Sequence, residues 1–390
     1  MSLNRRTFLG AGASAVATGL AGCAGSDGDT GTELTEGDGS TPATEADATT
    51  APPTDSYTVS MAPVGDVTFE AVPETFTVYE SGYADMAVAL GKGDDLLAVG
   101  NTARFYTEQY DELDGVSVNE EPTQLLGDSF AIDRELFYEL DSDVHLIDPQ
   151  WLLNNGFFKL EQSDVDSVGE DVGPFIGNTV FRRTDSWHDY RYYTLYEAFE
   201  KVAQVFQRED RYEAVKAVHD DAVAEVSANL PSADARPNAL LCFGASDQPE
   251  AFSPYRLTDR GTNKKQFRDL GLSDALAGTG VEGLSTNDRG QIDFETMLQV
   301  DPDVILMRGH ETKTEAEFRD SVVSFMEDHD VAAELTAVQD GNVFRGGPIY
   351  QGPLQHLFNL ERFATLLFPE QFSGELFSRA DLAAAVCGEA

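Results

Sequence analysis

Four arginines lie where they could bind a negatively charged ligand. Each one sits in a loop at the end of a predicted β-strand: Arg104, Arg256, Arg308 and Arg345. Guanidinium groups form charge-assisted, often bidentate hydrogen bonds to anionic oxygen atoms. Cations are scarce in this sequence, which has 26 Lys and Arg against 69 Asp and Glu. Their placement therefore favours an anion site, although each arginine could instead pair with a nearby acid.

A second set of residues supplies aromatic surface. The segment 181–193 combines arginine, tryptophan, histidine and tyrosine, and Trp151 follows another predicted strand. Arginine and aromatic side chains together suit a ligand that is anionic and partly apolar. Trp151 and Trp187 could equally belong to the core. The candidate ligand-binding residues are Tyr83, Arg104, Trp151, Arg183, Trp187, His188, Tyr255, Arg256, Arg308, His310, Arg345 and Tyr350.

The sequence patterns of catalytic and metal sites are not found. The six histidines show neither H-x-H nor H-E-x-x-H spacing, and His219 and His356 are interpreted as ordinary helix residues. Gly127-Asp128-Ser129 lacks the nucleophile elbow of serine hydrolases, and Gly91-Lys92-Gly93 is not a phosphate-binding loop. We therefore expect no catalytic residue, no bound metal and no cofactor.

One helix-turn-strand unit occurs twice, 160 residues apart. The first copy begins at Ile132-Asp133-Arg134-Glu135, and the second begins at Ile292-Asp293-Phe294-Glu295. In each copy an aspartate at the predicted N-cap precedes a short helix, a turn and a buried strand. The repeat indicates two lobes of similar construction.

Strands and helices alternate in both halves of the chain, which predicts parallel α/β sheets. An amphipathic helix is predicted from Arg211 to Leu230, after another helical stretch at about 194–207. The fold class is therefore α/β, with two parallel-sheet lobes joined by a long rigid helix and a ligand cleft between them. The expected boundaries are 57–193 for the N-terminal lobe, 194–230 for the connecting helices and 231–390 for the C-terminal lobe.

The N-terminal residues are typical of an exported lipoprotein. Arg5-Arg6 precedes a short stretch of small and apolar residues, as in a twin-arginine export signal, and Leu20-Ala21-Gly22-Cys23 is similar to a lipobox. We expect cleavage after residue 22 and a lipid on Cys23. Residues 23–56 are acidic and rich in Gly, Ser and Thr, which predicts a disordered tether.

The formal net charge of −43 excludes some partners. Nucleic acids and anionic membrane surfaces are bound through basic faces, so neither is expected here. The membrane is contacted only through the predicted lipid anchor. An acidic surface of this kind is typical of salt-adapted, halophilic proteins, in which it keeps the surface hydrated.

Short motifs in both halves of the chain occur in an informative order. Tyr83-Ala84-Asp85-Met86 is followed by Leu97-Ala98-Val99-Gly100, and Leu140-Asp141-Ser142-Asp143-Val144 has a counterpart in Asp301-Pro302-Asp303-Val304. Over about residues 57–368 this set resembles the ABC-transporter substrate-binding proteins of the siderophore and vitamin B12 type, with Ser142 in place of the usual proline. The resemblance implies two α/β lobes that hold a ligand between them and perform no chemistry.

The same resemblance implies where the protein would dock. In that family a surface glutamate on each lobe contacts the membrane permease, and the matching positions are Glu135 and Glu295. Independently of the resemblance, each glutamate would also favour the positive N-terminal end of its own helix. The two roles are compatible.

The sequence thus predicts a monomeric, lipid-anchored protein outside the cytoplasmic membrane that captures a ferric siderophore and delivers it to an ABC permease and its ATPase. A cobalamin or haem carrier is the alternative within this class. An exported hydrolase and a structural surface lipoprotein are the alternatives from other classes.

Overall fold

The computed structural model describes residues 56–127, 129–281 and 290–390, which belong to one compact unit. The predicted export signal, the lipidation site Cys23 and nearly all of the predicted tether lie outside the described residues, as does Asp128. No helix in the described ranges has both the length and the apolar composition needed to cross a bilayer.

The N-terminal lobe is built on a parallel sheet with strand order β5-β4-β3-β6. An antiparallel hairpin of β1 and β2 precedes this sheet and packs on α5. The strands of the lobe are β1 Tyr57–Met61, β2 Gly65–Phe69, β3 Phe76–Val78, β4 Leu96–Val99, β5 Thr123–Gln124 and β6 Val144–Leu146. Its helices are α1 Ser81–Ala89, α2 Glu135–Leu140, α3 Pro149–Asn154 and α4 Gln162–Asp171.

The C-terminal lobe holds a sheet with the order β11-β10-β7-β8, in which β9 also pairs with β7. Strand β8 runs antiparallel to β7, and the other pairs of described strands are parallel. The strands are β7 Asn238–Phe243, β8 Ser253–Tyr255, β9 Ser273–Asp274, β10 Val304–Arg308 and β11 Val343–Arg345. The helices are α7 Lys265–Asp269, α8 Phe294–Val300, α9 Glu315–Phe318, α10 Ser324–Asp328 and α11 Thr336–Gln339.

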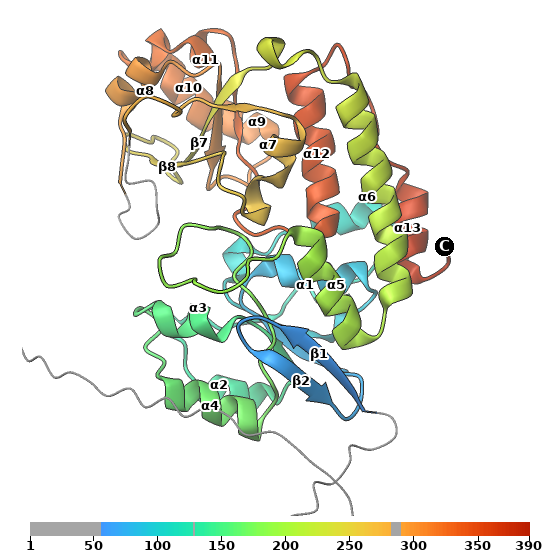
Figure 1. Cartoon of the computed structure of the whole chain (residues 1–390). Helices are drawn as coiled ribbons and strands as arrows, with labels where there is room; N and C mark the ends of the chain where they lie inside the picture. The colour runs from blue at the N-terminus through green and yellow to red at the C-terminus, as the bar shows by residue number, and fades with distance from the viewer. Residues whose placement is uncertain (1–55, 128, 282–289) are drawn as a thin grey trace, which may run out of the picture. The chain divides into compact units, whose positions relative to one another are not determined.

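Long helices join the lobes and confirm the predicted fold class. They are α6 Glu209–Asn229 and α12 Pro353–Leu367. Two further helices, α5 Leu195–Phe206 and the shorter α13 Arg379–Cys387, pack on α6 and on α1 of the N-terminal lobe. Helix α6 contacts α1 and α5 of the N-terminal lobe and α7 of the C-terminal lobe, and it runs beside α12 (Figure 1). The predicted stripe of α6 is buried at Val215, Ala222 and Val226.

The chain then returns to the N-terminal lobe. Helix α13 packs against α6 and α1. Nη1 of Arg211 in α6 donates to the carbonyl oxygens of Leu90 at 3.0 Å and Val386 at 2.7 Å, which ties the two segments together. Residues from the predicted C-terminal lobe therefore cover part of the N-terminal lobe.

The repeated unit forms α2 with β6 in one lobe and α8 with β10 in the other. Both helices end at a residue in the left-handed conformation, Asp141 with φ 47° and Asp301 with φ 45°. Asp143 and Asp303 then accept hydrogen bonds from backbone amides where the neighbouring strand begins. The predicted N-cap is confirmed for Asp293 in α8. In α2 the N-cap is Arg134, and Asp133, one residue earlier, accepts a hydrogen bond from the backbone amide of Glu135.

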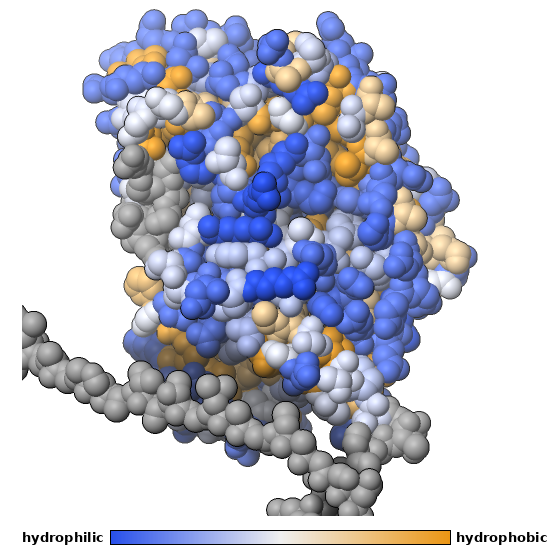
Figure 2. All heavy atoms as spheres, viewed as in Figure 1, coloured by the Kyte–Doolittle hydropathy of each residue, from blue (hydrophilic) through white to orange (hydrophobic). Residues whose placement is uncertain are grey.

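The core follows the alternation of side chains along the strands. In the C-terminal sheet, Leu241 and Leu306 face α12, while Leu240 and Ile305 face the layer of α8 and α10. One continuous core joins the first of these faces to the hairpin, α1, α5 and α6, and so extends through both lobes. Hydrophilic residues cover much of the face seen in Figure 2, in keeping with the acidic composition.

Candidate ligand-binding site

The carboxyl ends of the parallel strands in the two lobes meet. The ring of Tyr79, which follows β3, lies 6.5 Å from the ring of Tyr350, which follows β11. The backbone amide of Thr262 donates to the carbonyl of Val180 at 2.9 Å and forms a second contact between the lobes. Ligands of open parallel sheets bind at this edge, so the predicted position of the site agrees with the architecture.

Two of the four predicted arginines are paired with carboxylates of their own lobe. Nε of Arg256 lies 2.7 Å from Oδ2 of Asp274. Nε of Arg345 lies 3.6 Å from Oε2 of Glu315, and its Nη1 donates to the carbonyl of Lys313. For these two residues the structure therefore agrees with the ion-pair alternative.

Arg104 and Arg308 are different, because no carboxylate in the described part of the chain lies within 4.0 Å of either guanidinium. Arg308 is fully buried at the end of β10. Its Nη2 donates to the carbonyl of Asn263 and its Nε lies 3.4 Å from the carbonyl of Gly346, but its Nη1 has no partner. A buried cation with a free N–H donor is costly, so the guanidinium is well suited to donate a hydrogen bond to an anionic oxygen.

Tyrosine hydroxyls surround these two guanidinium groups. The guanidinium of Arg104 lies 5.9 Å from the ring centre of Tyr350 and is within electrostatic range of Tyr79 and Tyr255. The guanidinium of Arg308 lies 5.3 Å from the ring centre of Tyr255. Burial raises the pKa of both Tyr79 and Tyr350. These hydroxyls therefore stay protonated at neutral pH and can donate to a ligand.

The charges of both arginines act on Tyr106. Burial, together with the charge of Glu311, raises the pKa of Tyr106 to about 12, while the charges of Arg104 and Arg308 oppose this shift. The hydroxyl of Tyr106 is therefore within electrostatic range of both guanidinium groups.

The predicted aromatic residues form a cluster beside this group. The ring of Trp151 lies 5.4 Å from Phe181, which lies 4.8 Å from Tyr350. Trp187 stacks on His188 at 5.6 Å with an interplanar angle of 10°. Trp151 is buried and Trp187 is half-buried, so Trp187 is the more accessible of the two.

Asp148 holds the aromatic segment in place. Its Oδ2 accepts hydrogen bonds from the amide and hydroxyl of Thr179 at 2.8 and 2.9 Å and from the hydroxyl of Tyr190 at 2.5 Å. Arg182 pairs with Asp185 at 2.5 Å, and its guanidinium lies 4.7 Å from the ring centre of Trp151. Segment 181–193 is thus fixed to the N-terminal lobe by buried polar contacts.

Three further predicted residues have structural partners. The hydroxyl of Tyr83 is buried and exchanges hydrogen bonds with the backbone of Asn178. Nε2 of His310 lies 2.5 Å from the carbonyl of Gly244. Nη2 of Arg183 donates to the carbonyl of Tyr193 at 3.1 Å. None of the three is among the side chains that surround Arg104 and Arg308.

Sequence reasoning missed Tyr79, Tyr106 and Phe181. Tyr79 directly follows β3, and Tyr106 comes two residues after Arg104 in the loop that follows β4. Their positions at strand ends were a usable signal. Tyrosine is also a common core residue, and position alone does not distinguish the two roles.

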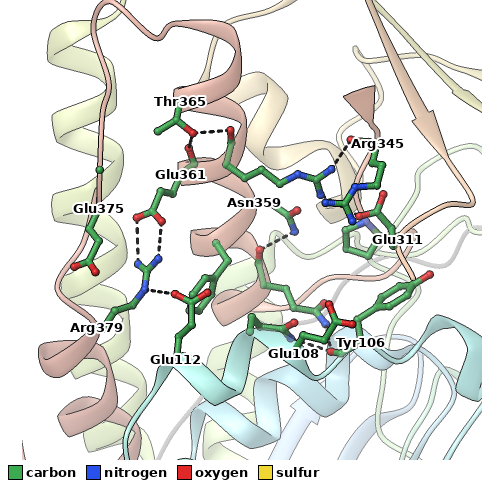
Figure 3. A pocket seen from close by; sticks show the side chains of 16 residues that line it. Tyr106, Glu108, Glu112, Glu311, Arg345, Asn359, Glu361, Thr365, Glu375 and Arg379 are labelled. Carbon is green, nitrogen blue, oxygen red and sulfur yellow. Dashed lines mark hydrogen bonds and ion pairs between the residues drawn. The ribbon is translucent and has the colours of Figure 1, made fainter. Parts of the chain in front are cut away.

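A cavity of about 660 Å³ adjoins the site (Figure 3). Tyr106, Glu311 and Arg345 line one part, and Glu361 and Arg379 line another part beside α12. Five glutamates and three arginines line the cavity in all, and Arg379 pairs with Glu361 at 2.5 Å. Acids outnumber bases in this cavity, so the cavity itself does not favour an anion. An anion is favoured by the neighbouring arginine–tyrosine group, which consists of Arg104, Arg308, Tyr79, Tyr106, Tyr255 and Tyr350.

The two predicted docking residues are accessible. Glu135 is exposed in the first turn of α2, where Arg134 lies 3.2 Å away, and Glu295 is exposed in the first turn of α8. One residue belongs to each lobe. A group of side chains that could hold a metal ion lies elsewhere, where α6, α7 and α12 meet.

Comparisons with known proteins give a family and a fold. A family profile described as periplasmic binding protein matches residues 77–350. A search of curated protein sequences finds no match. A periplasmic binding protein from Veillonella parvula DSM 2008 has a TM-score of 0.57 and 14% sequence identity, over 80% of this chain and 98% of that one.

Two other solved structures are similar in fold. The iron uptake ABC transporter substrate-binding protein PiuA from Streptococcus pneumoniae Canada MDR_19A has a TM-score of 0.54 and 15% identity, over 80% of this chain and 98% of its own. The heme binding protein HmuT has a TM-score of 0.54 and 15% identity, over 82% of this chain and 92% of its own.

Proposed function

Since this chain belongs to the periplasmic binding protein family, we propose that it is the extracytoplasmic binding component of an ABC importer and that its cargo is a ferric siderophore. The protein binds its substrate and does not convert it, so the hydrolase alternative falls away. In this proposal Cys23 carries the lipid anchor, and a permease with its ATPase receives the cargo.

The observation that carries the proposal is the pair of unpaired guanidinium groups, Arg104 and Arg308, among the hydroxyls of Tyr79, Tyr106 and Tyr350. In a chain with a net charge of −43, an anionic cargo needs a local site that overcomes the overall repulsion. Two cations without a carboxylate partner, beside phenol groups, can donate hydrogen bonds to the acidic oxygens of a ferric chelate, and Nη1 of Arg308 is a free donor.

The first test is a titration of tryptophan fluorescence in the tag-free protein with an anionic ferric tricatecholate. Trp187 is half-buried beside the site, so binding should change the emission. Arg104→Gln and Arg308→Gln should each weaken binding by about 10- to 100-fold, since each removes a charge-assisted hydrogen bond. Circular dichroism verifies that both variants are folded.

Arg256→Gln is the matched control, because the guanidinium of Arg256 already pairs with Asp274. It should bind the chelate like the wild type. Wild-type affinity in both Arg104→Gln and Arg308→Gln would contradict the proposed site.

Haem and cobalamin are the alternative cargoes, because an aromatic cleft also suits a large ring system. Cobalamin is less anionic, so its binding should be nearly insensitive to Arg104→Gln and Arg308→Gln. Parallel titrations with haem and cobalamin therefore identify the cargo class. If the tryptophan emission changes with none of haem, cobalamin and the iron chelates, the proposed cargo is contradicted.

The exposed glutamates at the starts of α2 and α8 support the proposed docking. Glu135→Arg combined with Glu295→Arg should abolish uptake in cells while chelate binding by the purified protein stays unchanged, because neither residue lies at the ligand site. Glu139→Arg, another substitution in α2, serves as the control. Normal uptake with both charges reversed would rule out this docking mode.

A further inference from the structure

His219, Asp269 and His356 come from three helices and converge where α6, α7 and α12 meet. One ring nitrogen of each histidine and one carboxylate oxygen of Asp269 lie within 4.8 Å of one another. His219 is 6% exposed and His356 is completely buried. None of the three belongs to the arginine–tyrosine group, so this cluster is distinct from the proposed cargo site.

Several buried atoms of this cluster have no hydrogen-bond partner. They are Nε2 of His219, Nδ1 of His356 and the hydroxyl of Tyr196 in α5. The ring of Tyr196 lies 4.1 Å from that of His219, which in turn lies 5.2 Å from His356. Buried polar atoms are almost always satisfied, so the free Nε2 of His219, beside a second histidine and a carboxylate, indicates that a further group binds there.

The hydrogen bonds that do exist orient the histidines as metal ligands. Nδ1 of His219 lies 2.8 Å from Oδ1 of Asp220. With a proton on Nδ1, the lone pair of Nε2 is directed at the cluster, which is the carboxylate–histidine–metal arrangement. Nε2 of His356 lies 2.8 Å from Oδ2 of Asp269, so a second nitrogen and a carboxylate oxygen face the same point.

We propose that His219, His356 and Asp269 bind a divalent first-row transition-metal ion, with Zn²⁺ as the best fit. Two imidazoles and a carboxylate form a common donor set for this ion, and water completes the coordination. Zn–N bonds are about 2.0–2.1 Å long, which places the ligand atoms of a tetrahedral site about 3.3 Å apart. The ligand pairs that now lie up to 4.8 Å apart must therefore approach, while Nε2 of His356 and Oδ2 of Asp269, at 2.8 Å, must separate slightly. On binding, the Nε2 proton of His356 transfers to its free Nδ1, and the lone pair of Nε2 becomes the ligand.

Lys265 is the group that the ion would displace. Its Nζ lies 2.7 Å from Oδ2 of Asp269, and its side chain is 19% exposed. The ammonium can therefore turn toward solvent when the ion binds. Asp269 itself is 17% exposed, which leaves an entry path on the same side.

The ion would join helices that hold the two lobes together. Asp269 ends α7 of the C-terminal lobe, whereas α6 and α12 contact helices of both lobes. Metal bound there would stabilise the native state by mass action, because the unfolded chain does not bring the three ligands together. This role is independent of the cargo and does not rest on the proposed function.

The test uses the full, tag-free chain after treatment with a chelator. Equilibrium dialysis against Zn²⁺ followed by elemental analysis should find one tightly bound ion per chain, with a raised melting temperature. His219→Gln and His356→Gln should each weaken this binding by about 10- to 100-fold or more. His329→Gln is the control, because His329 lies beside Glu250 and outside the cluster.

Equal Zn²⁺ affinity in the wild type and in His219→Gln would overturn the proposal, because acidic surface residues would then account for the binding. No tight site in the wild type would also overturn it and would indicate a bridging water instead. If a variant fails to fold, Co²⁺ in the wild type decides. Intense visible bands of tetrahedral, nitrogen-ligated Co²⁺ are expected, and the weak bands of an octahedral aqua-carboxylate ion would refute the site.

Discussion

Asp85 lies in α1 of the N-terminal lobe, yet its carboxylate accepts hydrogen bonds from the first backbone amides of α12. The amide of Leu354 lies 2.9 Å from Oδ2, and the hydroxyl of Tyr110 lies 2.7 Å from Oδ1. Burial raises the pKa of Asp85 to about 7, although these hydrogen bonds oppose the shift. The charge state of this one residue is therefore coupled to the contact between α1 and α12.

The pH dependence of stability should reveal this coupling. Between about pH 4 and pH 7 the native state holds a proton on Asp85 that the unfolded chain has released. Its contribution to the free energy of unfolding therefore falls as pH rises, by about 1.4 kcal/mol per pH unit, and levels off above pH 7. In denaturant unfolding, the wild type should lose more stability across this window than Asp85→Asn.

Asp94→Asn is the control for this measurement, because Asp94 is exposed, accepts a hydrogen bond from the surface residue Ser117 and lies outside the contact between α1 and α12. Its pH profile should match that of the wild type. An Asp85→Asn profile parallel to the wild type would show that Asp85 titrates as in the unfolded chain.

For single residues, the sequence predicts which side chains lie near strand ends, but it does not predict which other side chains they contact. The four arginines do lie at or after strand ends, yet Arg256 pairs with Asp274, while no carboxylate among the described residues lies within 4.0 Å of the Arg104 guanidinium. Such pairings depend on which loops the fold brings together. His219 and His356 illustrate the same limit, because metal-binding motifs describe local spacing and these two residues meet only through the packing of α6 and α12.

The repeated helix-turn-strand unit shows how one sequence pattern builds both lobes. Asp143 Oδ2 accepts hydrogen bonds from the amides of Glu74 and Thr75, both at 2.9 Å, just before β3. Asp303 Oδ2 does the same for the amide of Asn238 at 2.8 Å, at the start of β7. Each aspartate therefore aligns its own strand with the neighbouring strand of the sheet.

Two substitutions in the turn between α2 and β6 should separate the effect of the Asp143 hydrogen bonds from the effect of the left-handed backbone at Asp141. Asp143→Ala removes a charged acceptor from two backbone amides and should lower the free energy of unfolding by about 1 to 2 kcal/mol. Asp141→Gly, two residues earlier, should leave it unchanged or raise it by up to about 1 kcal/mol, because φ of Asp141 is 47° and glycine adopts this region without strain.

Urea unfolding followed by circular dichroism measures both effects, and Asp303→Ala tests the equivalent position in the other lobe. Asp143→Ala as stable as the wild type would mean that the hydrogen bonds do not contribute to stability. The same conclusion would follow if Asp141→Gly were the more damaging change.

Elements with strong local patterns were predicted well. The stripe of α6 and the apolar run of β7 were both evident in the sequence. The return of α13 to the N-terminal lobe was not, because its partner Arg211 and the helices α6 and α1 on which it packs lie far away in the sequence and no local signal marks them. The strand ends were predicted to within a few residues, although Arg308 and Arg345 close their strands and Trp151 belongs to α3. The contacts between the lobes follow from tertiary packing.

The acidic excess acts on the molecule as a whole. With 69 acidic and 26 basic side chains, the native state carries strong self-repulsion at low ionic strength. The Debye length falls from about 10 Å at 0.1 M salt to about 3 Å at 1 M, so added salt screens this repulsion.

The melting temperature should therefore rise with KCl at neutral pH. Near pH 4, where many carboxylates are protonated, the salt effect should shrink, and this comparison controls for effects of salt unrelated to charge. A melting temperature independent of KCl at neutral pH would show that charge repulsion does not limit stability.

Helix α13 has a consequence for how the protein is made. Its apolar residues Leu382 and Val386 belong to the same core as α1 and α6. The ribosome must therefore synthesise the chain as far as Cys387 before the N-terminal lobe can bury that surface. Until then a nascent chain exposes part of its first lobe to chaperones and proteases, and this lobe reaches its final form late in synthesis.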